Sequence, residues 1–505
     1  MDPVYVGLDL GTSSLKAVAV DAGGSAVAAA SSAYETHRPE PGAAEQDPQD
    51  WFRAVRIVVA ELRAQVPSAR WAGVGLSAMI PTLLPTDVRG EPFGRAITWQ
   101  DGRAERYGEL LRTTFGGARL YELTGQWVDG RYLVPMSWWL AETHRRSTGT
   151  ARGQRILGAK DYLFGWLTGA PATDPSTAAG YGCYDLVEGA WSTELLAVAP
   201  SLLMASLPPV LPSTTARPLT AGRAADLGLP AGLPVVLGAA DSVLGAYGLG
   251  VTEPGDVAYL AGTSTVVLGV SPELVRDHRH RYLVTPLGVG SGWGLEMDLL
   301  STGAAVEWLA NVTGATVDVA GLLALADTVD PAASNLPVFL PYLAPGEQGA
   351  LWDPALTGAV TGLDLSHGRA ELARALVNGI LVESRRCLSV LETASGGAGT
   401  VRLAGRTTGG RFAQDLADAS GRPVVRAGSG PRADRASALG AALLARLAVS
   451  YEPGSSMEDG AAEAVAAPDR ARAAAWASIA DRHDAVLRAV RATRAPSPDA
   501  PGGTR

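Results

Sequence analysis

Apolar residues alternate with polar or small residues on both sides of a short turn near the start of the chain. In VYVGLDLGTSSLKAVAVDAGG, residues 4–24, the turn Gly11-Thr12-Ser13-Ser14 separates two such runs. A period of two is typical of β-strands, so this stretch predicts a hairpin with a small, hydroxylated and flexible turn. A carboxylate stands just before the turn and a cation just after it.

The same pattern returns about half a chain later. Residues 256–270, DVAYLAGTSTVVLGV, again show a strand, a Gly-Thr-Ser turn and a strand, with Gly262 in the place of Gly11. Two similar hairpins at this separation predict two related halves, each built around a sheet.

Strand patterns alternate with helical patterns through the rest of the chain. Residues 45–66 predict a helix with Asp47 as N-cap and Pro48 at the first helical position. Further helices are expected at 155–168, 303–314, 373–394, 412–421, 435–448 and near 471–493. Strands are expected at 71–79 and 400–405, a strand that runs into a loop at 96–103, and a strand–turn–helix unit at 233–250. This alternation indicates an α/β protein.

Length and composition bound the class of protein. A chain of 505 residues is long for one hydrophobic core, so two or more domains are expected, and 47% hydrophobic residues suffice to fill them. The net charge of −9 argues against a nucleic-acid-binding protein. Apolar runs fall short of the roughly 18–20 residues of a membrane span, and the N-terminus enters a strand without a signal peptide. Cys183 and Cys387 lack metal-site spacing and favour buried thiols in a reducing cytoplasm.

The two Gly-Thr-Ser turns are candidates for phosphate binding. Such a turn can aim several backbone N–H groups and hydroxyls at one point, an arrangement that holds anions. Lys16 adds a point charge suited to phosphate, and Asp9 could hold Mg²⁺ through water, because hard cations take oxygen ligands. The alternative is an ordinary hairpin turn. The first turn is not a P-loop, since GxxxxGK[ST] does not occur.

Asp241, in GAADSVLGAYG, follows a strand pattern at a position where ligand sites form in α/β sheets. One interpretation is a general base that accepts a proton from a substrate hydroxyl. The other is a helix N-cap, and the residues alone leave the two open.

Taken in order along the chain, these motifs resemble the FGGY family of carbohydrate kinases, in the sugar-kinase/actin/heat-shock ATPase superfamily. The resemblance covers most of residues 4–448 and rests on VGLDLGTSSLKAV, EQDPQDWF, AITWQDGR, GAADSVLGAYG, AGTST, FLPYLAPGE, AGRTTGGRFAQDLADASGRPV and ALGAALLA. It implies an α/β fold of two ribonuclease-H-like domains with a cleft between them. It also implies transfer of the ATP γ-phosphate to a hydroxyl of a small sugar, sugar acid or polyol. We accordingly expect an N-terminal domain (1–245), a C-terminal nucleotide domain (246–450) and a C-terminal helix with a disordered tail (451–505).

The resemblance also assigns roles by position. It makes Asp241 the catalytic base and Asp9 the carboxylate associated with Mg²⁺. The implied ATP- and phosphate-binding residues are Thr12, Ser13, Lys16, Gly262, Thr263, Gly405, Arg406 and Thr407, and the implied substrate-binding residues are Met79, Ile80, Trp99, Asp241 and Ser242. ATP and Mg²⁺ are the implied cofactors and a small sugar or polyol the implied partner, with a homodimer left open.

Three departures from the family pattern bear on the substrate and the nucleotide. Members similar to xylulokinase or gluconokinase usually carry Met-His where this chain has Met79-Ile80, so the imidazole that would contact the sugar is missing. Arg406 replaces the third glycine of the family's Gly-Gly-Gly-Ala turn and adds bulk near adenine. Gln348 replaces the arginine of a Gly-Glu-Arg segment and so removes one cation.

We therefore expect a cytoplasmic, ATP- and Mg²⁺-dependent kinase whose first substrate candidate is a ketopentose such as D-xylulose. Gluconate or a polyol is the alternative within the family. Two rivals come from other classes: a catalytically silent sugar sensor, favoured by Ile80, Gln348 and Arg406, and a plain ATPase, which the AITWQDGR segment disfavours. No nucleic-acid or membrane partner is expected.

Overall fold

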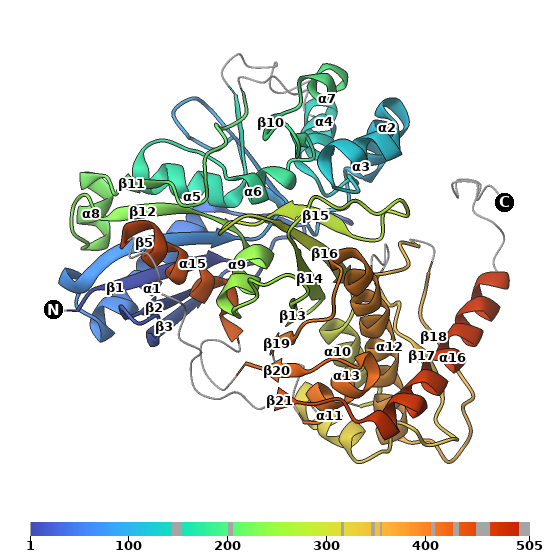
Figure 1. Ribbon diagram of the computed structural model, residues 1–505. Helices are drawn as coiled ribbons and strands as arrows, with labels where there is room; N and C mark the ends of the chain where they lie inside the picture. Colours follow the sequence, from blue (N-terminus) through green and yellow to red (C-terminus); the bar gives the residue numbers. More distant parts are fainter. Residues whose placement is uncertain are drawn as a thin grey trace.

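The computed structural model contains two large β-sheets, one from each half of the chain (Figure 1). It describes residues 2–143, 154–199, 206–314, 318–344, 349–353, 356–405, 410–427, 434–450 and 465–493. Arg406, Thr407 and Gln348, which the sequence analysis singled out, lie outside these residues. Among the described helices, none is long and apolar enough to cross a membrane.

The N-terminal sheet has six strands in the order β11-β12-β5-β1-β2-β3. β1 runs antiparallel to β2 and parallel to β5, and β12 runs parallel to β5. The strands are β1 (Val4–Leu10), β2 (Ser14–Val20), β3 (Ala26–Ala33), β5 (Trp71–Ala78), β11 (Ala216–Pro218) and β12 (Pro234–Ala240). β1 and β2 form the first predicted hairpin, with Asp9 opposite Lys16.

The C-terminal sheet repeats this arrangement in the order β15-β16-β14-β13-β19-β20-β21. β13 pairs antiparallel with β14 and parallel with β19, as β1 does with β2 and β5. The strands are β13 (Val257–Ala261), β14 (Thr265–Ser271), β15 (Leu283–Pro286), β16 (Trp293–Leu299), β19 (Val401–Gly405), β20 (Val424–Arg426) and β21 (Val465–Ala466). The predicted internal repeat and the pair of ribonuclease-H-like domains are therefore confirmed, while the domain limits at residues 245 and 450 stay predictions.

Helices cover the outer faces of both sheets: α1, α5 and α8 on the N-terminal sheet, and α10 to α13 with α16 on the C-terminal one. The helices are α1 (Pro48–Gln65), α2 (Glu105–Phe115), α3 (Gly117–Thr124), α4 (Leu133–Thr143), α5 (Ala159–Thr168), α6 (Pro175–Ala179), α7 (Thr193–Val198), α8 (Ala221–Leu227), α9 (Asp241–Gly248), α10 (Gly303–Val312), α11 (Val319–Asp327), α12 (Arg369–Ser395), α13 (Phe412–Ser420), α15 (Ala436–Val449) and α16 (Arg470–Ala492). α1 starts as predicted, because Pro48 is its first residue and the Asp47 carboxylate accepts the Gln49 N–H at 2.9 Å.

A small four-stranded sheet, β4-β7-β6-β8, and helices α2 to α4 and α7 form an additional layer with its own core. The remaining strands are β4 (Glu45–Gln46), β6 (Thr82–Thr86), β7 (Ala96–Thr98), β8 (Arg155–Leu157), β9 (Tyr184–Asp185), β10 (Ala190–Trp191), β17 (Val338–Leu340) and β18 (Ala359–Thr361). The helix expected at 155–168 was wrong at its start: its first three residues form β8. α5 begins after Gly158, whose N–H donates to the Asp161 carboxylate at 3.1 Å.

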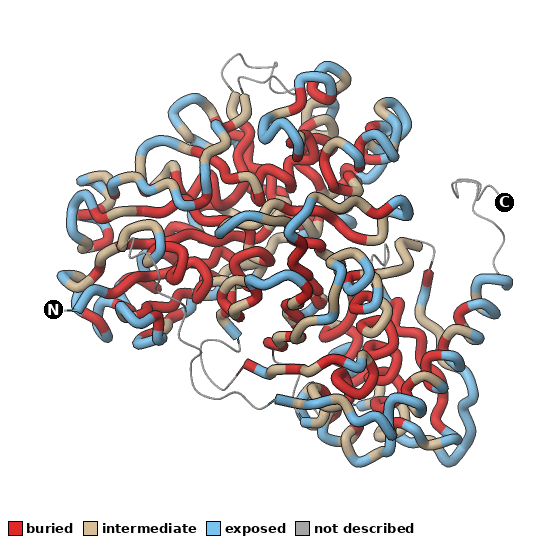
Figure 2. Tube along the Cα trace, in the orientation of Figure 1, coloured by how far each residue is buried: buried red, intermediate tan, exposed pale blue. Residues whose placement is uncertain are grey.

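α9 and α15 join the two sheets. Their buried side chains share one core with residues of both sheets. Figure 2 shows buried segments through the middle of the molecule and exposed segments around its rim. Gly7 and Gly75 face the backbone of α15 at Ala438 and Ala441, and a Cβ at either glycine would collide with it. The late helix α15 therefore lies directly on β1 and β5, which brings segments from both halves of the chain to the same strand ends.

Candidate active site

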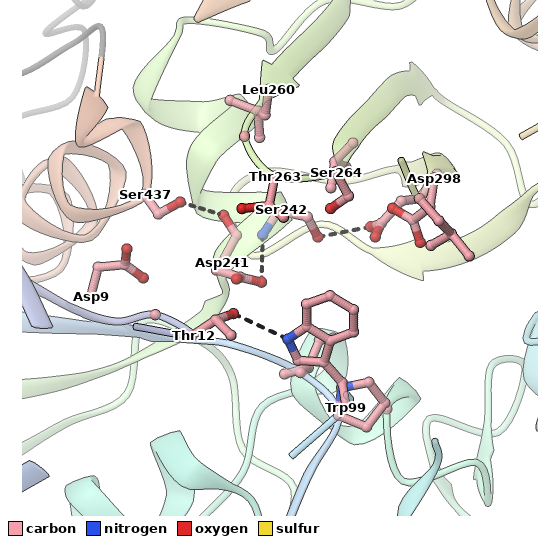
Figure 3. Close-up of a pocket in the computed structure, with 18 of the residues that line it drawn as sticks. Asp9, Thr12, Trp99, Asp241, Ser242, Leu260, Thr263, Ser264, Asp298 and Ser437 are labelled. Carbon is pink, nitrogen blue, oxygen red and sulfur yellow. Dashed lines mark hydrogen bonds between the residues drawn. The ribbon is translucent and has the colours of Figure 1, made fainter. Parts of the chain in front are cut away.

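A cavity of about 420 Å³ lies where the two halves meet, and segments of both line it (Figure 3). The N-terminal half contributes the turn after β1 and the start of α9. The C-terminal half contributes the turn after β13, part of β16, the end of β19 and the start of α15. The lining residues that the sequence analysis named are Asp9, Thr12, Ser13, Lys16, Ile80, Trp99, Asp241, Ser242, Gly262, Thr263 and Gly405.

The first glycine turn is held by hydrogen bonds to its backbone and to one hydroxyl. The Gly11 N–H donates to the Ser14 carbonyl at 3.1 Å, and the Gln46 side-chain amide donates to the Thr12 carbonyl at 2.7 Å. The indole N–H of Trp99 donates to Thr12 Oγ1 at 3.1 Å. This last bond fixes the aromatic wall of the cavity to the turn.

Asp9 stands at the end of β1 with its carboxylate almost fully buried. Ser77 Oγ, on the neighbouring strand β5, donates to Asp9 Oδ1 at 2.8 Å. Burial raises the pKa of Asp9, and the Ser77 hydrogen bond and the charge of Lys16 oppose that rise. Lys16 Nζ donates to the Asp434 carbonyl at 3.0 Å, so the cation links the first turn to the segment that precedes α15.

A backbone hydrogen bond also closes the second glycine turn, over one residue fewer than in the first. The Gly262 N–H donates to the Ser264 carbonyl at 2.7 Å, and the Thr263 carbonyl accepts the Ala304 N–H of α10 at 2.9 Å. At the end of the adjacent strand, Gly405 has φ +123°, a conformation that side chains rarely adopt. A Cβ there would also collide with the Ala261 backbone, so glycine lets β19 approach β13 closely at the cavity.

Asp241 is the first residue of α9 and lies near the centre of the cavity (Figure 3). Ser437 Oγ donates to its carbonyl at 2.8 Å, and the Ser242 N–H donates to its Oδ1 at 3.0 Å. Burial, and then the charge of Asp9, raise the pKa of Asp241 to about 8. The N-cap position itself belongs to Ala240, and Asp241 is the first residue of the helix, where its side chain accepts one N–H of the first turn.

A buried ion pair supports the backbone just before Asp241. Lys160 Nζ lies 3.0 Å from Asp174 Oδ1, and both side chains are fully buried. Ser176 Oγ donates to Asp174 at 2.6 Å and accepts the N–H of Ala240 at 2.9 Å. The ion pair is thus connected by two hydrogen bonds to the residue that precedes the carboxylate.

Two more carboxylates reach the cavity from β16. Glu296 and Asp298 are separated by one residue, so both side chains lie on the same face of the strand. Ser242 Oγ donates to Glu296 Oε2 at 2.7 Å. Arg131 also lines the cavity and forms an ion pair with Asp129 at 2.6 Å.

Comparison with known proteins then decides the class of this site. The model of the FGGY family of carbohydrate kinases, N-terminal domain, matches residues 4–248, and that of its C-terminal domain matches residues 257–449. The chain belongs to this family. The kinase is therefore a sugar phosphotransferase with a small sugar or polyol as substrate, and it uses ATP, as the family does.

Relatives of this kinase match it over most of their length. A xylulose kinase from Klebsiella pneumoniae is 31% identical over 451 residues, which cover 89% of this chain and 91% of that protein. A gluconokinase from Bacillus licheniformis is 26% identical over 392 residues, or 75% of each chain. The solved structure of a ligand-bound xylulose kinase from Lactobacillus acidophilus superposes with a TM-score of 0.88 at 25% identity, covering 97% of this chain and 99% of that chain.

On the substrate side of the cavity, the two neighbouring residues predicted to bind substrate, Met79 and Ile80, point in different directions. Met79 is 1% exposed and packs in the N-terminal core, whereas Ile80 lines the cavity. The Met79 N–H still pairs with the Leu10 carbonyl, so the residue continues the strand and its side chain turns into the core. Glu296 and Asp298 line the cavity although the sequence motifs do not point to them. The available signal was the alternation of acidic and apolar residues in LEMDL.

Proposed function

We propose that this kinase transfers the γ-phosphate of ATP to a hydroxyl of a ketopentose, with D-xylulose as the first candidate. The observation that supports this most is the position of Asp241, in a single cavity that both glycine turns line. The relative named xylulose kinase from Klebsiella pneumoniae is 31% identical over 89% of this chain, against 26% over 75% for the gluconokinase from Bacillus licheniformis, and this difference favours D-xylulose over gluconate.

In the proposed reaction, Asp241 is the general base. Its carboxylate accepts the proton of the substrate hydroxyl while the hydroxyl oxygen bonds to the γ-phosphorus. The bond from that phosphorus to the bridging oxygen breaks, and ADP leaves with the electron pair. A carboxyl with a pKa raised to about 8 is a stronger base, once ionised, than an exposed aspartate.

The two turns are the proposed phosphate sites. The backbone N–H groups and hydroxyls of Thr12, Ser13 and Thr263 border the cavity, and Lys16 adds a positive charge beside the first turn. Such groups stabilise the negative charge of a transferring phosphoryl group. Gly405 would lie beside the nucleotide, and the roles of Arg406 and Thr407 at the adenine stay predictions.

Mg²⁺ fits the donor groups around the first turn. In kinases, Mg²⁺ usually keeps several waters and is held by one or two carboxylates together with the substrate phosphates. Asp9 offers such a carboxylate: Ser77 fixes one oxygen, and burial raises its pKa, so the ionised form needs a counter-charge. Within the described part of the chain, no group of three or more His, Cys, Asp or Glu side chains forms a metal site. When bound, Mg²⁺ would neutralise charge on the phosphates.

The test is ADP release by the purified protein with ATP and Mg²⁺ across D-xylulose, D-ribulose, D-gluconate, glycerol and erythritol. We expect D-xylulose to stimulate release in the wild type and to bind without turnover in Asp241→Asn. The surface variant Glu253→Gln is the matched control and should behave as the wild type. Sugar binding without ADP release in the wild type would favour the silent sensor. ADP release at the same rate with and without each sugar would favour a plain ATPase.

We also propose a cytoplasmic location. Cys183 and Cys387 are buried in two separate cores, so they cannot pair with each other without disrupting the fold. Buried thiols of this kind suit a reducing compartment. A homodimer stays a prediction.

A further inference from the structure

Five acidic residues line the cavity, and the proposed reaction uses the carboxylates of two of them, Asp9 and Asp241. Asp434 lies beside Lys16, which donates to its carbonyl. The remaining two, Glu296 and Asp298, come from β16. Figure 3 shows Asp9 and Asp298 on opposite sides of Asp241, so the β16 carboxylates border the part of the cavity away from the first turn. The hydrogen bond from Ser242 Oγ to Glu296 Oε2 places Glu296 directly beside the proposed base.

The neighbouring strands supply no counter-charge to this pair. Val266 of β14 lies opposite Asp298, while Leu268 of β14 and Leu283 of β15 lie opposite Glu296. Burial, and then the charge of Asp298, raise the pKa of Glu296, as expected where negative charge is in excess.

Arg131 is the cation on this side of the cavity, and carboxylates flank it. Its Nε and Nη2 donate to the two oxygens of Asp129 at 3.0 and 2.6 Å, and Asp298 lies near enough to interact with its charge. The guanidinium therefore faces two aspartates, and Glu296 adds a third carboxylate to the same wall. Lys16 serves the other end of the cavity, beside Asp9 and the Asp434 carbonyl.

We propose that Glu296 and Asp298 select a neutral, polyhydroxylated acceptor and reject sugar acids. A carboxylate accepts hydrogen bonds from sugar hydroxyls, and a carboxyl that burial keeps protonated can also donate one to a hydroxyl oxygen, so both acidic groups match a polyol. A sugar acid would add a further negative charge beside this acidic pair in a buried site, where repulsion between like charges is strong. This inference rests on the proposed function and assigns ketoses and polyols, rather than aldonates, to the acceptor site.

The test compares acceptors that differ at one terminal carbon, a hydroxymethyl group against a carboxylate: xylitol with D-xylonate, and D-glucitol with D-gluconate. Calorimetry gives the dissociation constant of each, and kcat/KM is measured for every compound that is phosphorylated. We expect the neutral member of each pair to bind at least about 30-fold more tightly to the wild type. Glu296→Gln and Asp298→Asn keep the side-chain shape and remove the charge, and each should reduce that preference at least about fivefold. Glu273→Gln, an exposed carboxylate of the same domain, is the control and should leave the preference unchanged.

The outcomes separate this inference from the proposed function. Phosphorylation of gluconate as efficient as that of a neutral acceptor would overturn the inference and leave the kinase intact. A protein that phosphorylates nothing yet binds neutral members more tightly would overturn the proposed function and uphold the inference. Equal binding within each pair, or an unchanged preference in both variants, would overturn the inference. Using two variants keeps the test valid if one of them does not fold.

Discussion

The buried ion pair beneath Asp241 gives a prediction whose size can be worked out. Lys160 Nζ lies 3.0 Å from Asp174 Oδ1, 3.6 Å from Asp161 Oδ1 and 3.3 Å from the Leu237 carbonyl, and all three side chains are fully buried. Lys160→Met fills similar space and removes the charge, which leaves two fully buried carboxyls without their cation. We expect a large loss of stability in the N-terminal domain.

Protonation of one carboxyl limits how much free energy of unfolding the variant can lose through charge repulsion. One carboxyl can take up a proton instead of staying charged. At pH 7 this costs about 4 kcal/mol for a carboxyl whose ordinary pKa is about 3.9, at 1.36 kcal/mol per pH unit. The value agrees with the roughly 3–5 kcal/mol expected when one partner of a buried pair is removed. At about 2–4 °C per kcal/mol, the melting temperature should fall by about 10 °C.

The pH dependence tests the cause. In the wild type, burial raises the pKa of Asp174, but the charge of Lys160 and the hydrogen bonds from Ser176 and Thr177 outweigh it and leave the pKa lowered. The stability from Asp174 is therefore present above its unfolded pKa and lost as pH falls through the folded one. Without Lys160, burial raises the pKa of Asp174, so the sign reverses and the penalty shrinks as pH falls. At pH 5, one proton costs only about 1.5 kcal/mol.

The assay is thermal unfolding of the wild type, Lys160→Met and the control Lys16→Met at pH 7 and pH 5. Lys16 is half-buried beside the cavity, and its removal should shift the melting temperature by no more than about 2 °C at either pH. A Lys160→Met variant within about 3 °C of the wild type at pH 7 would show that the fold tolerates the two buried carboxyls without their counter-charge. A deficit of the same size at both pH values would show that loss of packing, and not charge, is responsible.

Three further predictions concern the reaction and the cavity. Asp241→Asn should lower kcat about 10²–10⁴-fold with little change in sugar affinity, because the side chain keeps its shape and loses its basic carboxylate. A coupled assay of ADP release measures this, and equal turnover would exclude Asp241 as the base. At low concentrations of both substrates, kcat/KM reports the free enzyme, and it should fall as pH drops below about 8, since Asp241 must be ionised to accept a proton; a limb near pH 4 would contradict the raised pKa. Gly405→Ala should weaken ATP binding at least tenfold in calorimetry, because φ +123° and the Ala261 backbone leave no room for a methyl group; unchanged affinity would show that β19 adapts without disturbing the cavity.

The sequence predicts those parts of the fold that depend on local pattern. The two hairpins and the start of α1 follow from alternation and from the Asp47-Pro48 signal, and the structure has both. The repeat follows because the same turn occurs twice. The placement of α15 on β1 and β5 depends instead on contacts between Gly7 or Gly75 and residues more than 350 positions away, which no local pattern contains.

The residues of the site likewise divide into those that a local motif predicts and those that depend on the pairing of distant strands. Asp9, Thr12 and Asp241 stand next to recognisable turns, so motif and resemblance together find them. Glu296 and Asp298 lie inside a strand pattern, and only the pairing of β16 with β14 turns their shared face toward the cavity. The prediction that Met79 contacts the substrate differs from the structure for a related reason. At the end of a strand, a shift of one position decides whether a side chain faces the core, as Met79 does, or the cavity, as Ile80 does.

The use of lysine links the ion pair to the reaction site. The chain has two lysines, Lys16 and Lys160, and forty of its 42 Lys and Arg residues are arginine. Arginine therefore supplies nearly all of the positive charge. Each of the two lysines has an oxygen partner for its ammonium group, the Asp434 carbonyl for Lys16 and the Asp174 carboxylate for Lys160. At Lys160, the ammonium lies 3.0 Å from Asp174 Oδ1 and donates to the Leu237 carbonyl at 3.3 Å, while Asp161 Oδ1 lies 3.6 Å away, so a compact point charge serves both carboxylates. Lys16 lies across from Asp9 at the turn proposed for phosphate, where a point charge can approach an oxygen anion from one direction. Both lysines flank the elements that carry carboxylates of the cavity, one through the hydrogen bonds that lead to Ala240 and one through the pairing of β1 with β2. The two ammonium groups therefore lie near the elements that hold Asp9 and Asp241 close together despite the repulsion between these two carboxylates.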